Sequence, residues 1–177
     1  RLYRVLQDLG AAIDLLEPAP GLPDLPFTAN GGYVHGDRFL LSAFRYPQRQ
    51  AEAAHFERWF REHNYRVHAP PAGCSFEGEG DALAVGEAIF AGYRRRSDIG
   101  SHALLGQMTG REVLSLELAD PRFYHLDTCF APLAPDAALY YPPAFDEYGV
   151  RVIQHHLPRA VAVSPELARR FGCNAVV

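Results

Sequence analysis

The sequence is poor in cysteine and has no long apolar run. Its 177 residues include only three cysteines, Cys74, Cys129 and Cys173, and no CxxC spacing. That count argues against a disulfide framework or a zinc site and favours a reducing compartment, so we expect a cytoplasmic protein. No apolar segment approaches the roughly 18 residues that a membrane span needs, so we expect no membrane partner.

The chain also lacks an excess of positive charge. Seventeen lysines and arginines stand against 21 acidic residues, giving a net charge of -4, and a nucleic-acid partner is therefore not expected. The eight histidines show no ligand spacing, so we assign no metal. With 48% hydrophobic and 21% charged residues, the composition is that of a globular protein large enough to bury one substantial core.

A pattern of helix, strand, polar loop and hairpin recurs about every 50 residues, as in proteins whose repeated units bury one another's apolar faces. Apolar spacing predicts helices at 2–10, 48–64, 97–110 and 145–156, strands at 12–16, 65–68, 113–118 and 160–163, and hairpins within 33–42, 82–90 and 125–141. Polar residues stand at the same point of each unit: Asp24 and Asn30, Glu77 and Asp81, His125 and Asp127. If the units close into a ring, these residues meet in one central site.

The second polar loop runs from Phe76 to Asp81 and holds three carboxylates in five residues. Its glycines let the backbone approach a ligand closely. A solvated turn is the ordinary explanation, and the spacing does not match an EF-hand calcium loop. The loop is therefore a candidate binding site only in combination with other motifs.

The third polar loop places His125 beside Asp127, a pair suited to general acid–base chemistry. A hydrogen-bonded structural histidine would explain the same residues. If the segment is a strand, Cys129 shares their face but lies about 13 Å from His125 at ~3.3 Å per residue. We therefore expect Cys129 to belong to the core rather than to a Cys–His pair.

Two other polar segments have ordinary explanations. The basic run 94–96 precedes Ser97, which we expect to cap the following helix, although one of its arginines could hold a carboxylate. Arg49 and Glu52, near the start of the second helix, are expected on the surface unless an argument from outside the local sequence gives them a role.

Taken together, four motifs in fixed order carry a specific resemblance: Leu22-Pro-Asp-Leu-Pro-Phe-Thr-Ala-Asn30, Phe76-Glu-Gly-Glu-Gly-Asp81, Arg96-Ser-Asp98 and Phe123-Tyr-His-Leu-Asp-Thr128. Over nearly its whole length, the chain resembles the guanidino-group-modifying (pentein) superfamily, especially dimethylarginine dimethylaminohydrolases and arginine deiminases. The resemblance implies an α/β fold, a fivefold pseudo-symmetric propeller of which this chain supplies about three and a half blades. We expect residues 1–177 to be a single catalytic domain truncated at both ends, because the chain starts without methionine and 174–177 read as the start of a strand.

The resemblance also implies a mechanism without metal or organic cofactor. A cysteine thiolate attacks the guanidino carbon of arginine or a methylarginine, an amine or ammonia leaves, and water hydrolyses the adduct to citrulline. His125 matches the histidine that protonates the leaving group and activates water, and Glu77 matches the glutamate that assists it, with Glu79 as fallback. Carboxylates grip the guanidinium, and Arg49 and Arg96 match arginines that bind the α-carboxylate. The substrate-binding residues are thus Asp24, Asn30, Arg49, Asp81, Arg96 and Asp127.

Two departures from the family leave the reaction open. The family's nucleophilic cysteine is expected beyond residue 177, since neither Cys129 nor Cys173 matches it. Asn30 stands where many relatives carry an acidic residue, and so resembles the arginine dihydrolases, which yield ornithine and ammonia. Two further functions stay open, an amidinotransferase and an inactive arginine-binding module. The partner we expect is a small guanidino compound, and a homo-oligomer is left open.

Overall fold

The computed structural model describes residues 1–175 and contains three sheets of identical topology. In each sheet an antiparallel hairpin is followed by a third strand that pairs in parallel with the hairpin's second strand. The sheets are β1 (Gly32–His35), β2 (Arg38–Leu41) and β3 (Arg66–His68); β4 (Ala82–Val85), β5 (Ala88–Tyr93) and β6 (Glu112–Glu117); and β7 (Phe130–Ala134), β8 (Ala137–Tyr140) and β9 (Val161–Ala162).

A helix connects the second and third strands of every sheet, as a parallel pairing requires. These connections are α2 (Pro47–Gln50) with α3 (Glu52–Glu62), then η3 (Ile99–Ser101) with α4 (His102–Thr109), and η5 (Pro142–Ala144) with α5 (Glu147–His156). Helices α1 (Leu2–Asp8) and α6 (Pro165–Arg169) flank the three units. A 3-10 helix precedes each hairpin: η1 (Thr28–Gly31), η2 (Gly78–Gly80) and η4 (Leu126–Thr128).

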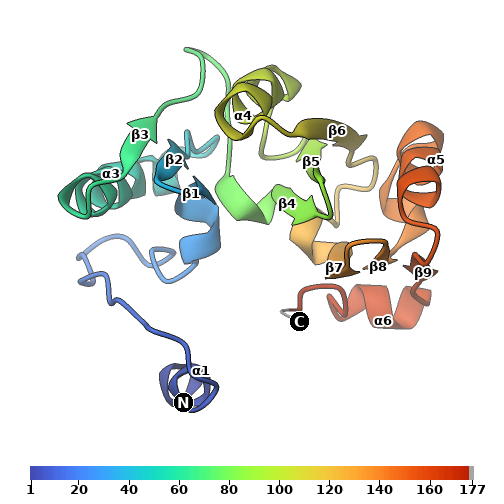
Figure 1. Cartoon of the computed structure of the whole chain (residues 1–177), viewed down its shortest axis with the longest axis horizontal. Helices are drawn as coiled ribbons and strands as arrows, with labels where there is room; N and C mark the ends of the chain where they lie inside the picture. The colour runs from blue at the N-terminus through green and yellow to red at the C-terminus, as the bar shows by residue number, and fades with distance from the viewer. Residues whose placement is uncertain (176–177) are drawn as a thin grey trace.

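The units stand side by side along an arc, with α3, α4 and α5 outside and β1, β4 and β7 toward the centre (Figure 1). Neighbouring units share their cores. One cluster joins Leu40 of the first sheet with Ile89 of the second and Leu105 of α4, and another joins Phe90 of the second sheet with Phe130 of the third. The expectation that repeated units bury one another's apolar faces is confirmed.

Several expected elements differ in the structure. Residues 12–16 form no strand. The expected helix 48–64 is interrupted at Ala51, which separates α2 from α3. The helix and strand expected to begin a fourth unit, α5 and β9, instead complete the third sheet.

Two local predictions were wrong. Ser97 does not cap a helix: α4 begins only at His102, and the Ser97 hydroxyl has other partners. The segment after His125 is the 3-10 helix η4 rather than a strand, so His125, Asp127 and Cys129 do not share a strand face. Cys129 is nevertheless fully buried in the core, as expected.

Within the described part of the chain, no helix has the length and apolar character needed to cross a membrane. The strand expected to start at 174–177 lies partly outside the described residues, which end at 175, and residues 174 and 175 belong to no strand.

Candidate active site

Of the three 3-10 helices that precede the hairpins, η2 contacts both η1 and η4. The approach of η1 and η2 depends on Gly78, the first residue of η2, whose φ is +61°. A Cβ there would lie 2.4 Å from the carbonyl oxygen of Ala29 and 2.6 Å from that of Gly32. Only glycine fits this backbone conformation and this contact without strain. The local sequence therefore brings the first two polar loops together.

His125 lies between two carboxylates from the second unit. Its Nε2 is 3.3 Å from Oε2 of Glu77, and its Nδ1 is 3.3 Å from Oδ1 of Asp81. All three side chains are buried, and Glu77 is 0% exposed. A buried carboxylate is costly unless it is paired, so this arrangement holds an imidazolium between two acids.

Ser97 links the two acidic residues on either side of His125. Its buried hydroxyl donates to Oδ2 of Asp81 at 2.6 Å and accepts the backbone N–H of Glu77 at 2.9 Å. Asp81 Oδ1 also accepts the backbone N–H of Leu126 at 3.1 Å. Asp81 is thus held from three sides behind the imidazole of His125, and it does not line the cleft described below.

The electrostatics of the site favour a charged His125. Burial alone would lower the pKa of His125, but Asp81, Glu77 and Asp127 outweigh it, and the pKa is raised above its usual value. Burial raises the pKa of Glu77, although His125 and Arg96 pull it the other way. Burial also raises the pKa of Asp127, to about 6. The imidazole is therefore suited to carry a proton near neutral pH.

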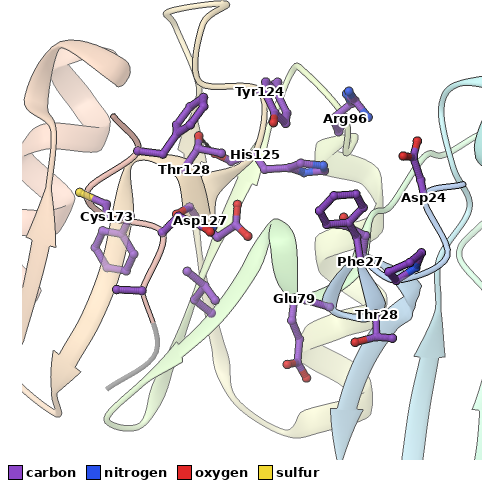
Figure 2. A pocket seen from close by; sticks show the side chains of 18 of the residues that line it. Asp24, Phe27, Thr28, Glu79, Arg96, Tyr124, His125, Asp127, Thr128 and Cys173 are labelled. Atoms are coloured by element: carbon purple, nitrogen blue, oxygen red, sulfur yellow. Dashed lines mark hydrogen bonds between the residues drawn. The ribbon is translucent and has the colours of Figure 1, made fainter. Parts of the chain in front are cut away.

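A cleft of about 610 Å³ opens in front of His125. Figure 2 shows His125 and Asp127 on one side of it, and Asp24 and Phe27 on the other. The carboxylate of Glu79 points away from His125 (Figure 2) and accepts the backbone N–H of Val34 at 3.2 Å. The structure thus brings Glu77, and not Glu79, to His125.

Two arginines, Arg96 and Arg49, reach the same cleft. The guanidinium carbon of Arg96 lies 4.6 Å from the ring centre of Tyr46 and 5.1 Å from that of Tyr124. Its Nη1 donates to Glu77 Oε2 at 3.3 Å. Arg96 is therefore held by two aromatic faces and one carboxylate.

Neither Arg49 nor Glu52 is on the surface, which is the position that the local sequence alone predicts for them. They are 7% and 0% exposed and form a bidentate ion pair, with Nε to Oε1 at 3.0 Å and Nη2 to Oε2 at 2.8 Å. The structure places Arg49 against Asn30, whose Oδ1 accepts from Nη1 at 2.9 Å. Arg49 and Glu52 stand at positions i and i+3, the spacing at which opposite charges meet on a helix, and that spacing is the signal that could have paired them.

The six polar residues that the repeat pattern placed at equivalent points therefore converge, as predicted. Four of them, Asp24, Asn30, His125 and Asp127, line the cleft, whereas Glu77 and Asp81 lie behind it. Sequence reasoning missed the part that Ser97 and Glu52 play. Ser97 had a local explanation as a helix cap because its partner Asp81 lies 16 residues away in sequence. Glu52 had a local explanation as a surface residue, although its spacing from Arg49 was a signal for their pairing.

Within the described residues, no group of three or more histidine, cysteine or acidic side chains has the arrangement of a metal site. The three cysteines are free. Cys173 lines the cleft, but burial raises the pKa of its thiol to about 11, and burial raises the pKa of Cys129 well above its usual value. Neither thiol is in the reactive thiolate form at neutral pH.

No protein-family model matches the chain. The bifunctional arginine dihydrolase/ornithine cyclodeaminase ArgZ of Synechocystis sp. is 44% identical over 180 residues, which are 99% of this chain and 25% of the relative. The N(G),N(G)-dimethylarginine dimethylaminohydrolase of Mycobacterium tuberculosis is 41% identical over 177 residues, 99% of this chain and 57% of the relative. The chain thus spans between a quarter and somewhat more than half of the length of these relatives.

Solved structures agree with these relatives. The N-terminal domain of ArgZ bound to substrate, in a cysteine-to-serine variant, matches 99% of this chain and 67% of its own length at 44% identity, with a TM-score of 0.93. A second solved structure is a dimethylarginine dimethylaminohydrolase adduct with S-methyl-L-thiocitrulline. It matches 94% of this chain and 64% of its own length, with a TM-score of 0.79. At 19% identity, this match shows the shared fold alone. The fold is that of an α/β propeller of repeated three-stranded units. The chain belongs to the guanidino-group-modifying (pentein) superfamily.

Proposed function

We propose that the protein containing this chain hydrolyses a C–N bond at the guanidino carbon of arginine or a methylarginine. The observation that carries the proposal is His125, held between Glu77 and Asp81 at the wall of a cleft that also exposes Asp24 and Asp127. A planar cation needs several carboxylate acceptors when it leaves water, and these residues supply them. Arg96 lines the cleft and provides a partner for the α-carboxylate of an amino acid.

In the proposed reaction, a cysteine thiolate outside these 177 residues forms a bond to the guanidino carbon. The C–N bond to the leaving amine breaks, and His125 gives that nitrogen a proton. Water then adds to the carbon, its proton passes to His125, and the C–S bond breaks to release citrulline and the thiolate. The raised pKa of His125 suits the first step, since the imidazolium is the proton donor.

Replacing His125 by alanine in the full-length protein tests the mechanism. We expect H125A to lose turnover of arginine and dimethylarginine while its dissociation constant, measured by calorimetry, stays within a few-fold of the wild type. D127A should weaken binding as well, because a charged partner of the guanidinium is lost. Normal turnover by H125A would contradict the mechanism.

Arginine dihydrolase activity is the second candidate, and it gives ornithine and ammonia. It is favoured by Asn30 in the cleft and by ArgZ and AgrE, both described as bifunctional arginine dihydrolases, at 44% and 46% identity. An asparagine-to-serine variant of the ArgZ domain is covalently bonded to a reaction intermediate. An amidinotransferase would instead require a second amine substrate, and an inactive arginine-binding module would bind arginine without product.

A further inference from the structure

Glu52 is a fully buried acid at the first position of α3, and its role is not explained by packing. It is 0% exposed, and both of its oxygens accept from the Arg49 guanidinium. A buried ion pair contributes little to stability compared with apolar side chains of the same volume. The role of this pair is therefore read from the groups that it holds in place.

Arg49 passes the constraint on to Asn30. The Arg49 Nε and Nη2 groups donate to Glu52. Its Nη1 donates to Asn30 Oδ1 at 2.9 Å, and its Nη2 also donates to the carbonyl oxygen of Asp24 at 3.3 Å. The guanidinium carbon lies 4.5 Å from the ring centre of Phe44. The guanidinium is thus fixed in one plane by contacts on its edges and on one face.

The contact with Arg49 decides which way the Asn30 amide points. A guanidinium only donates hydrogen bonds, so it selects the amide orientation whose oxygen faces it. The Asn30 NH₂ group then lies toward Gly80 and His125. A Cβ built on Gly80 would be 2.2 Å from Asn30 Nδ2 and 3.3 Å from His125 Nδ1. The amide donors and the imidazole therefore meet over the same glycine at the cleft.

A donor in this position has a chemical consequence. Every nitrogen of a guanidinium is a donor, so the Asn30 NH₂ group cannot donate a hydrogen bond to a guanidinium. An oxygen atom in the same place can accept a hydrogen bond from the NH₂ group. The oxygen that hydrolysis introduces is the one delivered by water to the guanidino carbon. An aspartate at this position would instead offer an acceptor to the cation.

We propose that Glu52 is a positioning residue: it clamps Arg49, and Arg49 in turn orients Asn30 so that its NH₂ group binds the water-derived oxygen. This inference rests on the proposed guanidino hydrolysis. Loss of the clamp frees the amide to rotate, which slows hydrolysis of the covalent adduct and not its formation.

The test is E52Q in the full-length protein, with E57Q as matched control. Glu57 lies on the same helix and pairs with Arg61 at the exposed surface. During turnover of arginine, E52Q should show a kcat at least about tenfold lower, as small misplacements at a reaction centre commonly cost. Intact-protein mass spectrometry should show accumulation of the adduct in E52Q, whereas E57Q should match the wild type.

A double-mutant cycle separates positioning from a general structural defect. In an N30A background, adding E52Q should change kcat by less than about twofold, because coupled residues are not additive. An equal loss in both backgrounds, or no adduct above the wild-type level in E52Q, would overturn the proposal. If E52Q does not fold, E52D keeps the charge but shortens the reach, and the same readouts apply with a smaller loss.

A wild-type protein that turns over no guanidino compound would reject the proposed function, and with it the binding of a water-derived oxygen by Asn30. The orientation of Asn30 by Glu52 and Arg49 is tested separately. The crystal structure of E52Q then decides it. A rotated or released Asn30 amide supports the positioning role, and an unchanged contact between Asn30 Oδ1 and Arg49 Nη1 overturns it.

Discussion

At the scale of single residues, burial and charge determine the chemistry of the site. Burial would lower the pKa of His125, but the carboxylates around it outweigh burial and raise that pKa. At Asp127, burial outweighs the attraction of His125, and the pKa rises to about 6. The charged forms of both groups therefore coexist between the pKa of Asp127 and that of His125. Asp127 loses its negative charge as pH falls, and His125 loses its positive charge as pH rises.

Under the proposed function, these shifts predict the pH profile of the full-length protein's activity. Below pH about 6, protonation of Asp127 should lower kcat/KM, because the guanidinium loses an acceptor. On the alkaline side, kcat/KM should fall only above the ordinary histidine pKa of about 6.5, as His125 loses its proton. Steady-state kinetics between pH 4 and pH 10, roughly the span of these groups, measures both limbs.

Two variants assign the acid limb. D127N should abolish the limb near pH 6 in whatever activity remains, since the group whose pKa is about 6 is then gone. D136N is the control, because Asp136 pairs with Arg159 at the exposed turn between β7 and β8, and its profile should match the wild type. An acid limb that persists in D127N would contradict the assignment to Asp127.

At the scale of elements, the site depends on how closely η1 and η2 approach. Gly78 permits this approach, since its φ is positive and its Cβ position is occupied by backbone atoms of the first unit. Gly36, in the turn between β1 and β2, has a similar φ of +58° but nothing within 4 Å of its Cβ position. The two glycines therefore share a backbone conformation and differ in the contact.

G78A and G36A separate backbone strain from steric conflict. G36A should lower the free energy of unfolding by about 1 kcal/mol, the cost of a left-handed alanine. G78A should cost at least about 1 kcal/mol more, because backbone atoms would have to move. Urea denaturation of the full-length protein and its variants measures both, and equal costs would show that the contact at Gly78 is unimportant.

The element scale also shows how far the sequence predicts the structure. Hairpin alternation around Gly36 and Gly86, and helical spacing around Phe56, predicted those elements because their apolar faces are local in sequence. The 3-10 helix at η4 was not predicted, since the backbone of Leu126 donates to Asp81 of the preceding unit. The break at Ala51 was not predicted either, because apolar spacing continues across it. The membership of the polar site was predicted by its repeated position, whereas the hydroxyl of Ser97 could not be assigned without its partner, which lies 16 residues away.

At the scale of the whole molecule, three units of one topology bring residues that are far apart in sequence to one place. His125 and Asp81 belong to different units, yet their side chains are 3.3 Å from each other. The repeat is thus the reason that the site exists, and the shared cores between neighbouring sheets keep it together.

Product analysis of the full-length protein tests most directly whether it is a guanidino hydrolase. The protein is given arginine and, separately, asymmetric dimethylarginine, and the amino acid and amine products are quantified. We predict release of ammonia or dimethylamine together with citrulline, or with ornithine if Asn30 directs the second hydrolysis. Binding of both compounds without any product would contradict the hydrolase function.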